Sequence, residues 1–238
     1  AKGKILYYTA GCGNCHMDEA SGSLIGGKGL ETPFGTFHPS NITPDPKTGI
    51  GGWSELTFIN AVKRGVRPDN APYYPALPYA NYAKASNEDL LHIKAYLDQL
   101  EPVSHQAPEN ELVFPANIRW GVEAYKKLLI SFDEFEPDPS KSDSWNRGAY
   151  LTEALAHCGM CHTPRTPWQT EDRSKAFQGA PALKAGERPA KAIAGWSVDD
   201  ITFSLNADAV DLYGLVNSKS SMAHVSYAFD AVPYEDQE

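Results

Sequence analysis

Apolar residues in the stretch 86–100 return at intervals of three and four positions, which is the period of one face of an amphipathic helix. These residues are Leu90, Ile93, Leu97 and Leu100. Ser86 stands just before them and Asp89 follows three residues later, which resembles a capping box with Asp at the third helical position. The pattern therefore predicts a helix over 86–100.

Similar patterns predict helices elsewhere. The segments are 2–11, 55–65, 120–130, about 145–157 and a helix that begins at Ser197. Ser54 is expected to cap the helix 55–65, and Ser144 precedes the helix at about 145–157. The chain also contains 19 glycines and 18 prolines, which predict long ordered loops rather than a regular sheet. The expected fold class is therefore all-α.

All four cysteines fall in two short clusters with the spacing Cys-x-x-Cys-His. The clusters are Cys12, Cys15 and His16, and Cys158, Cys161 and His162. This is the attachment pattern of c-type haem. Two thiols three residues apart can reach the two vinyl groups of one porphyrin, and the next residue then presents an imidazole to the iron. The sequence predicts two covalently bound haem c groups, attached outside the cytoplasm.

Other uses of paired cysteines fit this pattern less well than haem attachment. A thioredoxin-like pair needs a βαβ setting and no following histidine. A Cys-x-x-Cys pair can also form half of a zinc site, and two structural disulfides are possible by number. Two copies of the full motif, with no other cysteine in the chain, favour haem over all three.

The two halves of the chain repeat each other at an offset of about 145 residues. Besides the cysteines, Gly52-Trp53-Ser54 recurs as Gly195-Trp196-Ser197, and Glu88-Asp89 recurs as Glu235-Asp236. We therefore expect two tandem cytochrome c-like helical domains with long loops, each enclosing one covalent haem.

The expected boundaries of these domains follow from the repeat. They are 1–101 for the first domain, 102–143 for a linker that packs on the domains, and 144–238 for the second. Only two residues follow the capping region at 232–236, so the closing helix of the second domain is expected to be missing, through truncation or because it is dispensable.

The second iron has a clear candidate for its distal ligand. His162 is the expected proximal ligand, and Met222 follows later in the same half. The alternatives are that Met222 is core packing or that His224 is the ligand. Met17 and Met160 both adjoin an attachment motif, so neither can readily reach the opposite haem face.

The first iron, with His16 as its proximal ligand, has no such candidate. Met222 lies five residues before Tyr227, and Leu77 lies five residues before Tyr82, so the position equivalent to Met222 has no donor atom. The weak alternatives are His38, His92, His105, Lys84 and the tyrosines 73, 74, 79 and 82. The stretch 37–41 around His38 resembles the proline loop near the proximal face of cytochromes. An open sixth position would allow a small ligand to bind at this haem.

Several longer sequence segments resemble those of a known protein family. They are 32–37 (TPFGTF), 41–45 (NITPD), 49–53 (GIGGW), 74–79 (YPALPY), 114–117 (FPAN), 145–151 (WNRGAYL) and 157–165 (HCGMCHTPR). Through them the chain resembles the diheme or triheme cytochrome c subunits of bacterial membrane-bound dehydrogenases for alcohols, gluconate or aldehydes. Many of these relatives carry Met at the position of Leu77 or near Ala85, and here both are missing.

The resemblance implies a subunit on the periplasmic face of the membrane. It would accept electrons from a dehydrogenase catalytic subunit and pass them to a quinone, terminal oxidase or other cytochrome, with peripheral membrane association. Arg147 and Arg165 are candidates to pair with haem propionates. The expected function is electron transfer without catalysis of its own. The alternative is a haem enzyme or small-ligand sensor that uses the first haem.

Composition agrees with this class. The net charge of −9 makes nucleic-acid binding a poor expectation. Hydrophobic residues make up 42% of the chain, and no run of about 18 apolar residues could span a membrane. The chain begins Ala1-Lys2-Gly3 with no apolar signal region, so it is expected to be a mature or engineered form.

Overall fold

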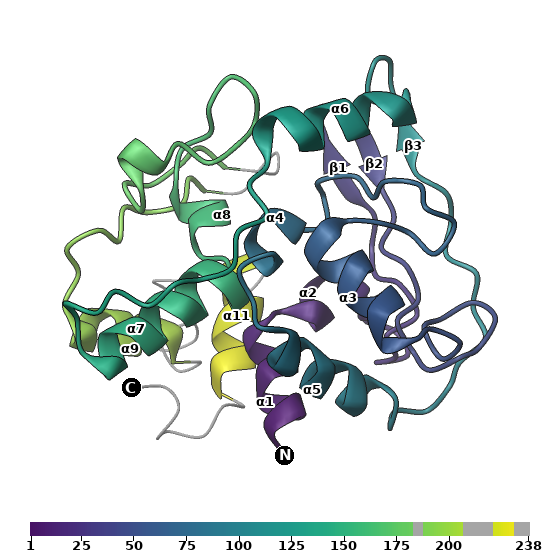
Figure 1. Cartoon of the computed structure of the whole chain (residues 1–238), viewed down its shortest axis with the longest axis horizontal. Helices are drawn as coiled ribbons and strands as arrows, with labels where there is room; N and C mark the ends of the chain where they lie inside the picture. The colour runs from purple at the N-terminus through teal and green to yellow at the C-terminus, as the bar shows by residue number, and fades with distance from the viewer. Residues whose placement is uncertain (183–187, 207–220, 231–238) are drawn as a thin grey trace.

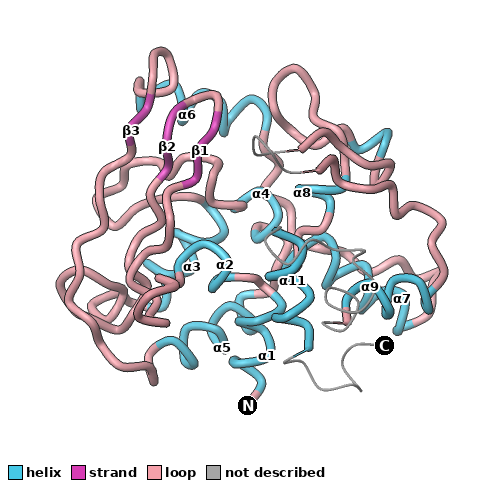
Figure 2. The backbone as a smooth tube through the Cα atoms, turned by 180° about the vertical axis from the view of Figure 1, so that it is seen from behind, coloured by secondary structure: helices cyan, strands magenta, loops and turns pink. Residues whose placement is uncertain are grey.

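The computed structural model describes residues 1–182, 188–206 and 221–230. The expectations for the side chains of His224 and Tyr227 and for the segment 232–236 fall outside the described residues. Two groups of helices lie on either side of the molecule, one formed by the first half of the chain and one by the second (Figures 1 and 2). Two helices, α4 (Tyr79–Tyr82) and α11 (Ser221–Asp230), lie between them. Among the described residues, no helix has both the length and the apolar character that a membrane span requires.

The first half is built on the crossing of two helices, α1 (Lys2–Thr9) and α5 (Asn87–Leu97). A Cβ atom on Gly3 would lie 2.0 Å from the carbonyl oxygen of His92, so only glycine permits this close approach. Ser86 caps α5, because its hydroxyl accepts a hydrogen bond from the Asp89 amide at 3.1 Å. The predicted apolar face of α5 is buried at Leu90, Ile93 and Leu97.

Helix α4 and two further helices complete the first half. The two are α2 (Cys12–His16) and α3 (Glu55–Arg64). Ser54 caps α3 as predicted, through a hydrogen bond from the Thr57 amide. Helix α3 ends at Gly65, whose φ of 57° is the left-handed conformation that glycine adopts without strain.

A small antiparallel sheet corrects the all-α expectation. Its strands, in the order β1-β2-β3, are β1 (Leu30–Thr32), β2 (Gly35–Phe37) and β3 (Glu111–Leu112). Leu30 pairs with Phe37 across the hairpin, and Gly35 pairs with Leu112. A Cβ atom on Gly35 would lie 2.1 Å from the Glu111 carbonyl oxygen, so the absence of a side chain at this glycine is what lets the linker strand approach.

The segment 102–143 packs closely on the first half. The Asn41 side-chain amide donates to the Val103 carbonyl at 2.8 Å, and Lys63 forms an ion pair with Glu134. The helix predicted at 120–130 is present as α6 (Arg119–Leu129). The buried Lys126 of this helix donates to the Gly65 carbonyl at 3.0 Å, which gives its ammonium group a hydrogen-bond partner.

The second half follows with α7 (Asp143–Tyr150), a π-helical turn η1 (Leu151–Leu155) and α8 (Gly159–His162). After them come the 3₁₀ turn η2 (Arg173–Lys175), α9 (Val198–Leu205) and α11. Ser142, not Ser144, caps α7, because its side chain accepts the Trp145 amide. A full capping box opens α9, where Ser197 and Asp200 exchange hydrogen bonds.

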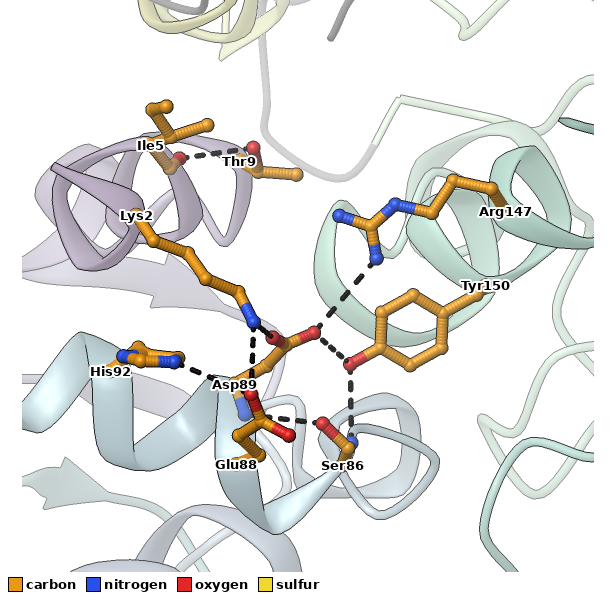
Figure 3. A network of polar contacts seen from close by, with 9 residues as sticks. All are labelled: Lys2, Ile5, Thr9, Ser86, Glu88, Asp89, His92, Arg147 and Tyr150. Atoms are coloured by element: carbon orange, nitrogen blue, oxygen red, sulfur yellow. Dashed lines mark hydrogen bonds and ion pairs between the residues drawn. The ribbon is translucent and has the colours of Figure 1, made fainter.

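Polar contacts centred on Asp89 join the two halves (Figure 3). The side chain of Asp89 is nearly buried and accepts from the Tyr150 hydroxyl at 2.8 Å. The Lys2 ammonium lies 3.1 Å from it, and the Arg147 guanidinium lies 3.9 Å away. Tyr150 also accepts from the Ser86 amide at 3.1 Å. One carboxylate thus links α1 and α5 to α7.

The segments that lie between the halves make reciprocal contacts. Helix α4 of the first half packs on η1, which immediately precedes the second cysteine motif. Helix α11 of the second half packs on α1 and α2, which lead into and carry the first cysteine motif, and on α9. Each half therefore contributes one helix that contacts the region around the other half's cysteine motif.

Candidate haem sites

The first cysteine motif forms the single helical turn α2, which places its two thiols and His16 on a short rigid element. The Nδ1 atom of His16 lies 2.6 Å from the Ser40 carbonyl oxygen. A carbonyl only accepts, so Nδ1 carries the hydrogen and Nε2 carries the lone pair. Burial lowers the pKa of His16, and the Ser40 carbonyl offsets part of this effect. The ring is therefore neutral at neutral pH, which is the form that binds a metal.

The second motif repeats this arrangement. His162 ends α8, and its Nδ1 atom lies 2.8 Å from the Lys191 carbonyl oxygen. The same reasoning leaves the Nε2 lone pair of His162 available to a metal. Each half thus presents one oriented imidazole beside two thiols.

The loops that hold these histidines could be predicted only in part. The stretch 37–41 resembles the proline loop near the proximal face of cytochromes, and Ser40 of this stretch contacts His16, the expected proximal ligand. The matching contact from Lys191 was missed, and Pro189 two residues earlier was its one available signal. Carbonyl groups of the motifs also accept hydrogen bonds from later loops. The Gly27 amide donates to the Cys15 carbonyl, and the Gly179 amide donates to the His162 carbonyl.

Burial disfavours ionisation of one thiol in each motif. Burial, the largest cause, raises the pKa of Cys12 to about 12 and that of Cys158 to about 11. The four cysteines form no disulfide, and the described residues contain no cluster of three or more His, Cys, Asp or Glu side chains that could hold a metal ion. The donor set in each half fits a covalent haem.

The first half is apolar at the position equivalent to Met222. Leu77 and Cys12 pack against one hydrophobic cluster, and Ala85 is a buried member of it. Several of the weak alternatives are engaged elsewhere. Lys84 pairs with Glu153, His38 with Glu111, His92 with Glu88, and the Tyr82 hydroxyl donates to Ala10. These contacts give none of the four residues an advantage as the distal ligand of the first iron.

Met222 lies on α11, half-buried, with its carbonyl accepting from the Ser226 hydroxyl at 3.2 Å. Its assignment as the second distal ligand stays a prediction. The two arginines have protein partners. Arg147 lies near Asp89, and Arg165 donates to the Met160 carbonyl at 2.7 Å, where it supports the second motif. Their pairing with haem propionates also stays a prediction.

Comparison with known proteins adds an independent line of evidence, although no family model matches the chain. A protein named diheme cytochrome c-type from Cereibacter sphaeroides is 35% identical over 247 residues, covering all of this chain and 82% of that protein. A nicotinate dehydrogenase subunit of Pseudomonas putida is 34% identical across 90% of this chain. The fructose dehydrogenase cytochrome subunit of Gluconobacter japonicus is 34% identical across 84% of it. The chain spans only 18% and 43% of these two dehydrogenase subunits.

Proposed function

This chain belongs to the family of c-type cytochromes, and we propose that it carries two haem c groups and transfers electrons between a dehydrogenase catalytic subunit and a respiratory acceptor. As a cytochrome c, it binds haem c covalently. The number of haems, the site residues and the partners belong to the proposal.

The residues divide into two equivalent sets. In the first half Cys12 and Cys15 would form the thioethers, and His16 would bind the iron through Nε2. In the second half the repeated motif would do the same through Cys158, Cys161 and His162, and Met222 would be a further ligand of the iron. The bound group supplies one-electron redox chemistry between ferrous and ferric iron.

The observation that carries the proposal is the pair of histidine-to-carbonyl hydrogen bonds. Ser40 and Lys191 each hold the proton on Nδ1, which fixes the tautomer, orients the ring and raises the basicity of Nε2. The same device in both halves supports a metal-ligand role for both histidines. It also supports a division into two haem-binding units, 1–101 and 144–238. The linker 102–143 contacts both of them, through Glu134 with Lys63 and through Asp138 with Asn146.

The names of the relatives, which include cytochrome subunits of dehydrogenases, support a role in electron transfer. Besides those above, a gluconate 2-dehydrogenase cytochrome c subunit of Pantoea cypripedii is 33% identical across 84% of this chain. A dehydrogenase catalytic subunit is therefore the proposed electron donor, and a quinone, terminal oxidase or another cytochrome the acceptor. We place the protein in the periplasm in peripheral association with the membrane, where these partners would meet it.

The test is to count the covalent haems per chain and to assign each haem to one cysteine motif. The chain is produced in a periplasm with haem-attachment enzymes, and covalent haem is measured by mass spectrometry and by the absorbance of the pyridine adduct. We expect two haems per chain, and one in each double variant, Cys12→Ala with Cys15→Ala and Cys158→Ala with Cys161→Ala. A wild-type chain with one haem would contradict the proposal. So would two haems that neither a small donor reduces nor a partner protein reoxidises.

A further inference from the structure

One tyrosine lies between the two cysteine motifs and contacts the residues that lead into both. Tyr82 of α4 is only 6% exposed, and its hydroxyl donates to the Ala10 carbonyl at 2.7 Å, two residues before Cys12. The same oxygen lies 3.4 Å from Nε2 of His157, the residue immediately before Cys158. The rings of Tyr82 and His157 meet edge to face, with centroids 5.6 Å apart.

The direction of these hydrogen bonds follows from counting protons. The phenol has one hydrogen, and it is used on the Ala10 carbonyl. The contact with His157 is a hydrogen bond when Nε2 carries the ring hydrogen and donates it to the Tyr82 oxygen. Burial keeps both groups neutral, because it raises the pKa of Tyr82 well above its usual value and lowers the pKa of His157 to about 4.

The surrounding contacts hold this bridge in one geometry. His157 has a φ of 41°, a left-handed conformation that a non-glycine residue adopts only when its surroundings impose it. On the other side, the Asn81 amide donates to the Glu153 carbonyl at 3.3 Å, and Lys84 pairs with the Glu153 carboxylate. These contacts dock α4 on η1 at both sides of Tyr82, so the phenol has little freedom to move.

We propose that Tyr82 is a positioning residue that links the two haem-attachment motifs and supports electron exchange between their haems. The inference rests on the proposed function, since it needs two haems. The link runs from Cys12 through the backbone to Ala10, across the Tyr82 hydroxyl to His157, and then to Cys158.

The redox step that this link serves is simple. With both haems bound, one electron would leave the ferrous iron of one half and reduce the ferric iron of the other. No proton moves along the bridge, because both of its side chains stay neutral, and no covalent bond forms or breaks. The first electron comes from a photoexcited ruthenium complex in the experiment that follows.

The experiment compares Tyr82→Phe with wild type in the two-haem protein. A light flash reduces one haem, and the electron is followed spectroscopically to the other. We expect the exchange to slow several-fold while each haem keeps its own reduction potential. Tyr150→Phe is the matched control, because it removes another hydroxyl that joins the halves, at Asp89, away from the motifs. Its exchange rate should equal that of wild type.

Two results would overturn the inference. One is an unchanged exchange rate in folded Tyr82→Phe, and the other is equal slowing in Tyr150→Phe, which would mean that any loosening of the halves suffices. If Tyr82→Phe fails to fold, His157→Asn removes the other end of the bridge, and asparagine tolerates the left-handed backbone. An unchanged rate in that variant would also refute the link. The haem count distinguishes a failure of this inference from a failure of the proposed function. A chain with two haems and an unchanged exchange rate refutes only the link through Tyr82, whereas a chain with one haem refutes the proposed function.

Discussion

Mild acid should destabilise this protein through His157. Its ring is packed against Tyr82 and the Ala10 carbonyl, both uncharged, and burial lowers its pKa from 6.5 to about 4. Between these values the unfolded chain binds a proton that the folded chain does not. The stabilising contribution is therefore fully present above pH 6.5 and is lost as the pH falls to about 4. Below that, both states are protonated and no further loss follows.

The magnitude follows from the size of the shift. One pKa unit corresponds to about 1.4 kcal/mol, so the change from 6.5 to about 4 is worth up to about 3 kcal/mol of unfolding free energy. That is a substantial part of the roughly 5–15 kcal/mol by which domains are normally stable. Carboxylates protonate over part of the same range, so the effect must be measured as a difference between two proteins.

The assay is guanidinium unfolding of wild type and His157→Asn from pH 7 to pH 4. Asparagine keeps the left-handed backbone and does not titrate in this range. The difference in unfolding free energy between the two proteins should change by up to about 3 kcal/mol across this range, with the wild type losing stability relative to the variant as the pH falls. Stability curves that stay parallel from pH 7 to pH 4 would refute the reasoning.

Three further substitutions test the fold and the sites. Gly3→Ala should cost about 1–3 kcal/mol, because its Cβ would lie 2.0 Å from the His92 carbonyl oxygen; an unchanged thermal midpoint would show that α1 and α5 can separate freely. Asp89→Ala should cost about 1.5–3 kcal/mol in denaturant unfolding by removing the charged acceptor of Tyr150, and a cost no larger than that of an exposed ion pair would contradict it. Met222→Ala should lower the potential of one haem and let carbon monoxide bind it, whereas an unchanged potential and spectrum would exclude Met222 as a ligand.

Much of the local structure could be predicted because its causes are local. Ser54, Ser86 and Ser197 each cap the helix that follows, since a serine hydroxyl needs only the amide three residues on. The apolar face of α5 was recognisable because its period is that of the helix itself. The helix expected from about residue 145, after Ser144, begins two residues earlier, because Ser142 caps it with the same chemistry. Such choices between near neighbours depend on packing.

The small sheet could not be predicted from local sequence patterns. Gly35 belongs to the glycines that predict loops, yet its missing side chain is what admits β3 from the linker. A pairing of this kind joins segments far apart in the chain, and strands of two or three residues are too short to show an alternating pattern. Nothing in either segment alone could identify the other.

The sequence by itself determined the chemistry that we propose for this protein, because Cys-x-x-Cys-His places two thiols and an imidazole within one helical turn. Only the tertiary structure decided how that chemistry is set up. The carbonyls of Ser40 and Lys191 orient the two histidines, and every residue has a carbonyl, so no residue type marks these positions. The contact of Tyr82 with His157 joins the two motifs across 75 positions. Folding alone brings such groups together, since their partners are set by the packing of helices and not by spacing along the chain.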